Sequence, residues 1–495
     1  MVDRGELSNK DLACEVLVIG SGAGGATVGN ELAKAGFDVL MLEEGDSVLA
    51  ENAPATLSES FMKIWRLGGM TLAKGSSLVS YAEGKCVGGS TEINSAIFQK
   101  TPDELIAKWI DTYDINAFSP DVLSPLYDEV ASLINASLTR GNLGAHSEIL
   151  RMAGERQGWE VRSLERGQRK CVGTNHCSIG CPTGAKQSMS SSVLKEYAKN
   201  RGRLISSCRV SRLIKGADGV DGVNAEISDF NGNTLSVVIR AKHVFVCGGA
   251  TQTPSLLLRS GYKKGVGKGF KLHPTLRVLA EFDEPVSAHN SRHPLYAITE
   301  FLPDYRIGGS VFTLPTFGMF LAEDWRNRDH MLPSYDHMGM YYAMARGSGE
   351  GSVTNVPFSK HPMIRYQLSE MDWVSIEAGL HNLSLALFES GARKIQPSIS
   401  GMKAWKSIDE MRNALKNRLP RARCNLMSIH LFSSIGMGEN KSLCAADSFG
   451  KIHDVRNLYV ADASLIPESP GVNPQATVMA FALRVAINFI EKELG

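Results

Sequence analysis

The feature that most constrains this chain is the segment GSGAGG at residues 20–25, which directly follows a short apolar run. Residues 14–19 (CEVLVI) are predicted to form a buried strand, because a β-rich apolar run stops there at glycines. Residues 23–35 are predicted to form a helix and residues 37–42 a second strand. This strand–helix–strand order around G-x-G-x-x-G is typical of a dinucleotide-binding unit, whereas the motif alone is often only a glycine-rich turn.

The residues of this motif have separate physical roles. Gly20 permits the tight turn, Gly22 lets the backbone approach a pyrophosphate, and Gly25 allows the helix to pack closely on the sheet. The first helical turn offers unpaired N–H groups to phosphate, and its residues are Ala23 and Gly24. Glu43, at the end of the second predicted strand, is placed to accept hydrogen bonds from ribose hydroxyls.

Length and charge narrow the class of protein. A chain of 495 residues predicts two or three domains. Its hydrophobic content of 43% and charged content of 21% are those of an ordinary globular protein. The formal net charge of +1 gives no reason to expect nucleic acid as a partner.

The N-terminus and the cysteines bear on the compartment. The first dozen residues are polar, and the apolar run after them is too short for a secretion signal. No stretch approaches the ~20 apolar residues of a transmembrane segment. The nine cysteines are odd in number and scattered, which argues for a reducing compartment. We therefore expect a cytoplasmic protein, unless a partner subunit directs it elsewhere.

The rest of the chain continues the α/β pattern. Residues 101–135 are predicted to be helical, with breaks at prolines, and residues 204–246 contain several predicted strands. The segment 475–493 is predicted to be a closing amphipathic helix. Interleaved helices and strands predict an α/β protein, although residues 275–345 could not be assigned.

Four ordered segments resemble one known family. They all follow the N-terminal motif, and they are GKCVGGSTEIN at 84–94, GATQTPSLLLRSG at 249–261, NLYVADASLIP at 457–467 and GVNPQATVMA at 471–480. Together they resemble the glucose–methanol–choline (GMC) oxidoreductases. The resemblance implies a Rossmann-like, discontinuous FAD-binding domain with a sheet-plus-helices substrate domain. It implies an FAD-binding domain at residues 1–100, 185–270 and 436–495, and a substrate-binding domain at 101–184 and 271–435.

The resemblance also implies which residues hold FAD. The matching residues are the flavin-loop residues Gly88, Gly89, Ser90 and Asn94, the adenine neighbour Val210, the pyrophosphate neighbours Asp462 and Ala463, and the ring neighbours Pro474 and Gln475. For Asp462, a capping role after a strand is the alternative. Some members attach FAD through a histidine where this chain has Ile93, so FAD is expected to be non-covalent.

A catalytic pair is implied by two further matches. His430, in SIHLFSSIGMG, lies where the family has its catalytic histidine, and Asn473 is in the place of its partner. His430 would accept the hydroxyl proton of an alcohol, Asn473 would bind the same oxygen, and the carbon would pass hydride to flavin N5. The alternatives are a core histidine and a helix-capping asparagine. Ser433 and Ser434 replace the Gly-Thr of the family.

Other histidines are not predicted to be catalytic. His273 and His453 also lie in family-like stretches, and both are predicted to be structural.

A cysteine-rich loop at 171–181, CVGTNHCSIGC, is not required by the family. Its cysteines Cys171, Cys177 and Cys181 resemble those that hold a [3Fe–4S] cluster in bacterial FAD-dependent glucose and gluconate dehydrogenases. Free thiols, a zinc ion bound with His176, and a disulfide are the alternatives. A cluster would pass electrons to a carrier protein or partner subunit, so the sequence favours an alcohol dehydrogenase over an oxygen-using oxidase.

The substrate is least determined by the sequence. Residues 311–346 are dense in methionine and aromatic side chains, which suggest a hydrophobic core more than a pocket. If some of them lined the pocket, an apolar or aromatic alcohol would fit better than a sugar. A non-redox FAD-containing lyase and an electron-relay subunit are the rival functions.

Overall fold

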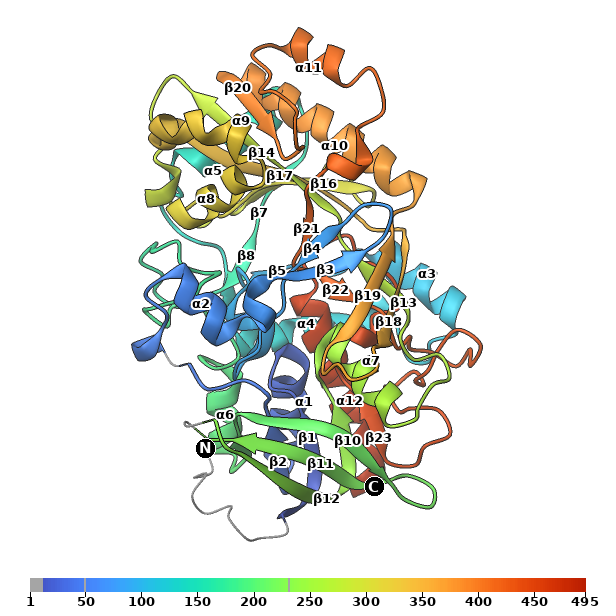
Figure 1. Cartoon of the computed structure of the whole chain (residues 1–495). Coiled ribbons are helices and arrows are strands. Elements are labelled where there is room, and N and C mark those ends of the chain that lie inside the picture. The colour runs from blue at the N-terminus through green and yellow to red at the C-terminus, as the bar shows by residue number, and fades with distance from the viewer. Residues whose placement is uncertain (1–11, 49, 230–231) are drawn as a thin grey trace.

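The computed structural model describes residues 12–48, 50–229 and 232–495 (Figure 1). The first eleven residues, on which much of the prediction of no secretion signal rests, lie outside the described residues. Within the described ranges, no helix is both long and apolar enough to cross a membrane.

The first sheet contains the predicted nucleotide unit. Its order is β10–β11–β12–β1–β2–β9, and β23 pairs with β12. β1 is parallel to both of its neighbours, β2 and β12. The strands are β1 Leu12–Ile19, β2 Val39–Leu42, β9 Arg203–Ile205, β10 Cys208–Lys215, β11 Val220–Ser228, β12 Thr234–Val246 and β23 Leu458–Val460. The strands predicted at 14–19, 37–42 and within 204–246 are confirmed.

Helices cover this sheet and contribute to the first hydrophobic core. α1 (Ala23–Lys34) packs against α12 (Gln475–Leu494), as Figure 1 shows in the lower part of the molecule. The further helices around this core are α3 Asp103–Tyr113, α4 Pro120–Leu133, α6 Val193–Lys199 and α7 Gly249–Arg259. The predicted first and last helices are confirmed, and the predicted 101–135 segment forms two helices. Pro120 starts α4, but the helix continues through Pro125 instead of ending there.

The second sheet lies above the first in Figure 1 and is the larger of the two. Its order is β22–β13–β18–β19–β3–β4–β21–β14–β17–β16–β15–β7, and β20 pairs with β14. The strands are β3 Thr71–Lys74, β4 Val79–Tyr81, β7 Val161–Ser163, β13 Lys268–Leu272, β14 Thr275–Phe282, β15 Tyr296–Ile298, β16 Tyr305–Gly309, β17 Met338–Ala345, β18 Glu350–Asn355, β19 Pro362–Gln367, β20 Ala392–Pro397, β21 Leu426–Ser428 and β22 Leu431–Phe432.

The remaining elements are short, apart from one long helix. α10 (Glu370–Glu389) packs on β17 and β20 and buries Trp373 and Leu380. The other helices are α2 Leu57–Ile64, α5 Ala145–Arg156, α8 Leu314–Ala322, α9 Trp325–Arg328 and α11 Ile408–Ala414. A small sheet consists of β5 Ile97–Phe98, β6 Ala136–Ser137 and β8 Glu165–Gly167.

Two segments pack differently from the predicted domain division. β3 and β4 fall within the predicted FAD segment 1–100, but they pair in the second sheet. α3 and α4 fall within the predicted substrate segment, but their apolar side chains Trp109 and Tyr127 belong to the first core. α3 and α4 belong to this core because α12 is buried along most of its length and needs apolar cover on more than one side.

Candidate active site

A large cavity extends from the carboxyl end of β1 to the second sheet. It brings together the predicted cofactor residues of all the motifs, except Gly25 and Gly88. Those that line it are Gly20, Gly22, Ala23, Gly24, Glu43, Gly89, Ser90, Asn94, Val210, Asp462, Ala463, Pro474 and Gln475. Gly25 instead serves helix packing, because a Cβ there would lie 2.0 Å from the carbonyl oxygen of Gly20.

The two glycine loops touch each other at the start of α1. A Cβ added to Gly89 would lie 2.9 Å from the Cα of Gly22, so the backbones meet too closely for a side chain there. The Gly88 N–H donates to Ser21 Oγ at 3.0 Å and fixes the two loops together. Gly22 is the N-cap of α1 and offers no side-chain cap, so the first-turn N–H groups are left for an anion.

The carboxyl group of Glu43 is held by hydrogen bonds from neighbouring residues of the protein. Its Oε2 accepts hydrogen bonds from the Ser21 N–H at 3.0 Å and the Ser21 hydroxyl at 2.7 Å, and its Oε1 accepts from the Gly45 N–H at 2.9 Å. Burial raises the pKa of this carboxyl, against the opposing effect of these bonds. The side chain is thus fixed at the edge of the cavity with lone pairs to spare for ribose hydroxyls.

A group of charged cavity residues was not predicted from the sequence. Arg66 Nη2 lies 2.9 Å from Glu44 Oε2, and Arg66 Nε lies 3.6 Å from Glu83 Oε2. Arg259 donates to the Val210 carbonyl at 3.2 Å, and burial lowers its pKa to about 10. Glu83 and Arg259 could have been noticed, because they border or belong to the matched segments 84–94 and 249–261.

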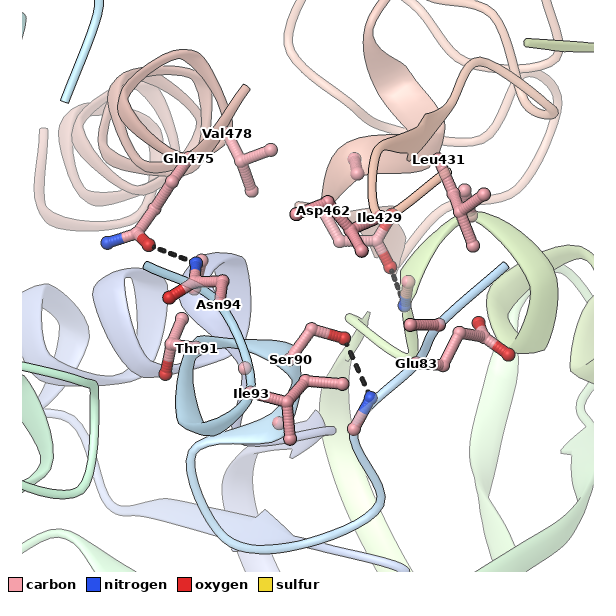
Figure 2. A pocket seen from close by; sticks show the side chains of 18 of the residues that line it. Glu83, Ser90, Thr91, Ile93, Asn94, Ile429, Leu431, Asp462, Gln475 and Val478 are labelled. Carbon is pink, nitrogen blue, oxygen red and sulfur yellow. Dashed lines mark hydrogen bonds between the residues drawn. The ribbon is translucent and has the colours of Figure 1, made fainter. Parts of the chain in front are cut away.

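The predicted flavin loop is tied to the C-terminal motifs, as Figure 2 shows. Asn94 Nδ2 donates to Gln475 Oε1 at 2.6 Å. Asp462 accepts the Gly249 N–H at 2.7 Å, and it also caps its own turn through the Ser464 N–H at 2.8 Å. The capping role considered for Asp462 is therefore present, and the residue lines the cavity as well.

The predicted catalytic residues meet at the cavity wall. Asn473 Nδ2 lies 3.0 Å from His430 Nε2, and both residues line the cavity. Pro474, not Asn473, is the N-cap of α12, and no side chain caps that helix. The Asn473 amide is therefore free of the capping role considered for it. Burial, with a smaller contribution from Arg306, lowers the pKa of His430 to about 3, so the imidazole is neutral.

His273, predicted to be structural, contacts the catalytic candidate directly. Its Nδ1 lies 2.9 Å from His430 Nδ1. The other histidine of that prediction, His453, bonds the Gly438 carbonyl at 3.1 Å and does not line the cavity. A single sequence gives no signal for the contact of His273, because 157 residues separate the two histidines.

The cysteine loop does not support the metal prediction. Among residues 12–48, 50–229 and 232–495, no three His, Cys, Asp or Glu side chains converge to hold a metal ion. Cys177 is buried and its sulfur accepts a hydrogen bond from Arg166 Nη2 at 3.1 Å, while Cys171 and Cys181 are partly exposed. All nine cysteines are free thiols, so the disulfide alternative is not seen either.

The methionine-rich segment is mainly core, as favoured from the sequence. Among the methionine and aromatic side chains of residues 311–346, Tyr342 lines the cavity and the others do not. The core members are Phe312, Phe317, Phe320, Met331, Met338, Met340 and Tyr341. Met344 is also buried, and Met319 is 44% exposed. The substrate side of the cavity is instead lined by Thr275, Arg277, His293, Ser310, Val311, Tyr342, Met427, Ile429 and Leu431.

The fold and the cavity are those of a dinucleotide-binding protein, and comparison with known proteins gives the family. Residues 61–275 match the N-terminal model and residues 349–482 the C-terminal model of GMC oxidoreductases. A GMC-type oxidoreductase of Sinorhizobium fredii, y4nJ, is 48% identical over 97% of this chain and 95% of its own length. The chain belongs to the GMC oxidoreductase family.

More distant similarities also extend over nearly the whole chain. A long-chain-alcohol oxidase of Arabidopsis thaliana, FAO4A, is 25% identical over 97% of this chain and 69% of its own. A formate oxidase of Aspergillus oryzae, studied for modification of its FAD, superposes with a TM-score of 0.75. That match covers 98% of this chain and 99% of the other, at 17% identity.

Family membership supports FAD as the cofactor, and the residues present fit it. The uncapped start of α1, the contact of the two glycine loops and the fixed Glu43 carboxylate supply the donors and acceptors that pyrophosphate and ribose need. At the other end, the Asn473 Oδ1 is buried and has no partner among the described residues. A bound ligand would satisfy it.

Proposed function

We propose that this protein oxidises an alcohol to an aldehyde or ketone, with His430 as general base and Asn473 as its partner. The observation that carries the proposal is the 3.0 Å contact of His430 Nε2 and Asn473 Nδ2 in the wall of the dinucleotide cavity. One acceptor and one amide donor at this spacing can bind the same hydroxyl group, the first through its proton and the second through its oxygen.

The neutral imidazole is suited to this role. Burial keeps His430 unprotonated, so its lone pair is available to take the hydroxyl proton. The Asn473 amide donates to the oxygen as negative charge develops there. FAD, when bound, would accept the hydride that leaves the same carbon. Loss of one proton and one hydride removes two protons and two electrons from the alcohol, and a carbonyl remains.

We further propose how FAD is held. The glycine loop around Gly22, the carboxylate of Glu43 and the backbone near Val210 would bind its nucleotide half. The loop from Gly89 to Asn94 and the start of α12 would bind its ring. Ile93 has no nucleophilic atom for a covalent bond to the flavin, which supports non-covalent binding.

The substrate side favours an alcohol with an apolar body. Met427, Ile429 and Leu431 line the cavity on both sides of His430 in sequence, and Figure 2 shows Ile429 and Leu431. These apolar side chains would contact the apolar body of a ligand, while polar groups of the wall fix its orientation. The naming of FAO4A as a long-chain-alcohol oxidase is consistent with such a substrate.

The electron acceptor is a separate question. The preference for a carrier depended on a cluster in the cysteine loop, and the described residues contain no metal-binding group there. The proposal therefore routes no electrons through Cys171, Cys177 or Cys181. Reoxidation of the reduced protein by air and by an artificial acceptor such as a quinone, compared at equal concentration, decides between the two.

The direct test is anaerobic reduction of the bound flavin. A panel of a long aliphatic alcohol, an aromatic alcohol, choline and glucose is mixed with the holoprotein, and bleaching near 450 nm is followed. Bleaching by the first two, lost about 10²–10⁴-fold in His430→Gln with FAD still bound, is the expected result. His330→Gln, at an exposed position, is the control and should bleach normally. No bleaching by any alcohol would favour the lyase or relay alternatives.

A further inference from the structure

Strand pairing places two histidines against each other beside the catalytic candidate pair. β13 and β22 are antiparallel, with Leu272 opposite Leu431. The next pair in this register is His273 and His430. Their Nδ1 atoms lie 2.9 Å apart, and the rings are perpendicular with centroids 5.0 Å apart. The contact is therefore built into the sheet and does not depend on a flexible loop.

The pair is shielded from water. His273 is 0% exposed and His430 8% exposed. The Phe432 ring packs on His273 with centroids 4.8 Å apart. Burial lowers the pKa of both imidazoles, and the charges that face them are those of Arg306 and, for His273, Arg346. Both rings are therefore neutral, with one N–H and one lone pair each.

Two neutral rings joined through Nδ1 atoms have coupled hydrogen positions. One Nδ1 must donate and the other must accept, so the tautomer of one ring fixes the tautomer of the other. If His430 Nδ1 donates, its Nε2 carries the lone pair and acts as an acceptor. If His273 Nδ1 donates, His430 must instead carry its hydrogen on Nε2 and cannot accept a proton there.

The Asn473 amide selects between these arrangements. Its Nδ2 faces His430 Nε2 at 3.0 Å, which is a hydrogen bond only if Nε2 is the acceptor. His430 Nδ1 then carries the hydrogen and donates it to His273 Nδ1. The remaining hydrogen of His273 is on Nε2, a buried atom without a partner among the described residues.

We propose that His273 is a positioning residue, which holds His430 in the tautomer whose Nε2 lone pair faces the cavity. The proposal rests on the proposed function, because that lone pair is the one that would take the hydroxyl proton. It assigns to His273 a role through His430 only, because His273 does not line the cavity.

The first test needs no substrate. In holoprotein labelled with ¹⁵N-histidine, long-range ¹H–¹⁵N correlation distinguishes the two neutral tautomers of each ring. Signals are assigned from the peaks lost in His430→Gln and in His273→Asn. We expect the hydrogen on Nδ1 of His430 and on Nε2 of His273. A hydrogen on Nε2 of His430 would overturn the proposal, whether or not the protein oxidises an alcohol.

The second test compares three variants in anaerobic flavin reduction by whichever alcohol of the panel bleaches the flavin. Asn offers an oxygen close to the place of the histidine Nδ1, whereas Gln places its oxygen farther out and Leu has no acceptor. We expect His273→Leu and His273→Gln to lower the limiting rate about 10-fold or more, with little change in the alcohol concentration at half-saturation. His273→Asn should restore most of that rate.

The outcomes separate the two proposals. Equal rates in His273→Leu and the unmodified protein would overturn the positioning role and leave the proposed function intact. A loss of rate that is the same in all three variants would also overturn it, because a merely structural role predicts no rescue by Asn. If the variants do not fold, the tautomers of the unmodified protein still decide.

Discussion

Asn94 and Gln475, 381 residues apart in the sequence, are joined by a hydrogen bond of 2.6 Å between Asn94 Nδ2 and Gln475 Oε1. Asn94 also holds its own loop, because its Oδ1 accepts the Ala96 N–H at 2.9 Å. Gln475 begins α12, two residues after Asn473. The bond thus fixes the predicted flavin loop relative to the start of α12, close to the proposed catalytic amide of Asn473.

This relationship predicts an energetic coupling. Asn94→Ala and Gln475→Ala should each destabilise the holoprotein, and the double variant should lose less than their sum. We expect a coupling of about 0.5–3 kcal/mol from urea unfolding, as for residues in one hydrogen-bond network. The exposed pair Glu196 and Lys199, 2.7 Å apart, is the control and should couple by less than about 0.5 kcal/mol. Equal coupling in both pairs would contradict the role of Asn94.

The pH dependence of flavin reduction follows from the buried imidazole. Burial lowers the pKa of His430 to about 3, below the ordinary value of about 6.5. The lowered pKa keeps the base unprotonated as the pH falls through 6.5. The limiting rate of anaerobic flavin reduction should therefore stay flat between about pH 8 and pH 5. A fall with an apparent pKa of 6–7 would show that His430 is protonated there and would contradict this prediction.

The cysteine loop predicts a difference between its thiols. Arg166 is 2% exposed, and its Nη2 donates to Cys177 Sγ, while its Nε has no partner among the described residues. Cys177→Ala should destabilise the protein by about 1–3 kcal/mol, because a buried charge loses its acceptor. Cys171→Ala, at a partly exposed position, should cost less than about 0.5 kcal/mol.

Urea unfolding of the two variants measures this difference. Iron analysis of anaerobically purified protein tests separately whether the loop holds an iron–sulfur cluster. Three or four irons per flavin, lost in Cys177→Ala, would contradict the interpretation of the loop as free thiols.

Local patterns were enough to predict the nucleotide half of the fold. A short apolar run ending in G-x-G-x-x-G predicts a strand, a turn and a helix within about 25 residues. The structure has β1 and α1 at these positions. Residues of the motifs at 84–94 and 471–480 line the same cavity, as the resemblance of the ordered segments to one family led us to expect.

Contacts that depend on distant pairing could not be predicted in this way. The placement of β3 and β4 in the second sheet requires β19 and β21, which pair with them from about 290 and 350 residues further along the chain. His273 meets His430 because β13 pairs with β22, and no periodicity in a single sequence encodes that pairing. The cysteine spacing suggested a metal centre, but spacing alone does not fix where the side chains point. In the structure, the Cys177 sulfur accepts a hydrogen bond from Arg166.

Ser433 stands where the family has a glycine, and we predict that restoring the glycine stabilises the protein. Ser433 has a φ of 62°, in the left-handed region where a Cβ costs free energy, and its buried hydroxyl has no partner among the described residues. Its N–H bond to the Ala463 carbonyl at 3.1 Å belongs to the backbone and would survive substitution. Ser433→Gly should therefore raise the free energy of unfolding by about 1 kcal/mol, measured by urea denaturation of the holoprotein.

Ser433→Ala keeps the Cβ and removes only the hydroxyl, so a gain in Gly that exceeds the gain in Ala isolates the backbone contribution. A loss of stability in Ser433→Gly would mean that the hydroxyl has a favourable partner in the holoprotein, and that this partner outweighs the strain.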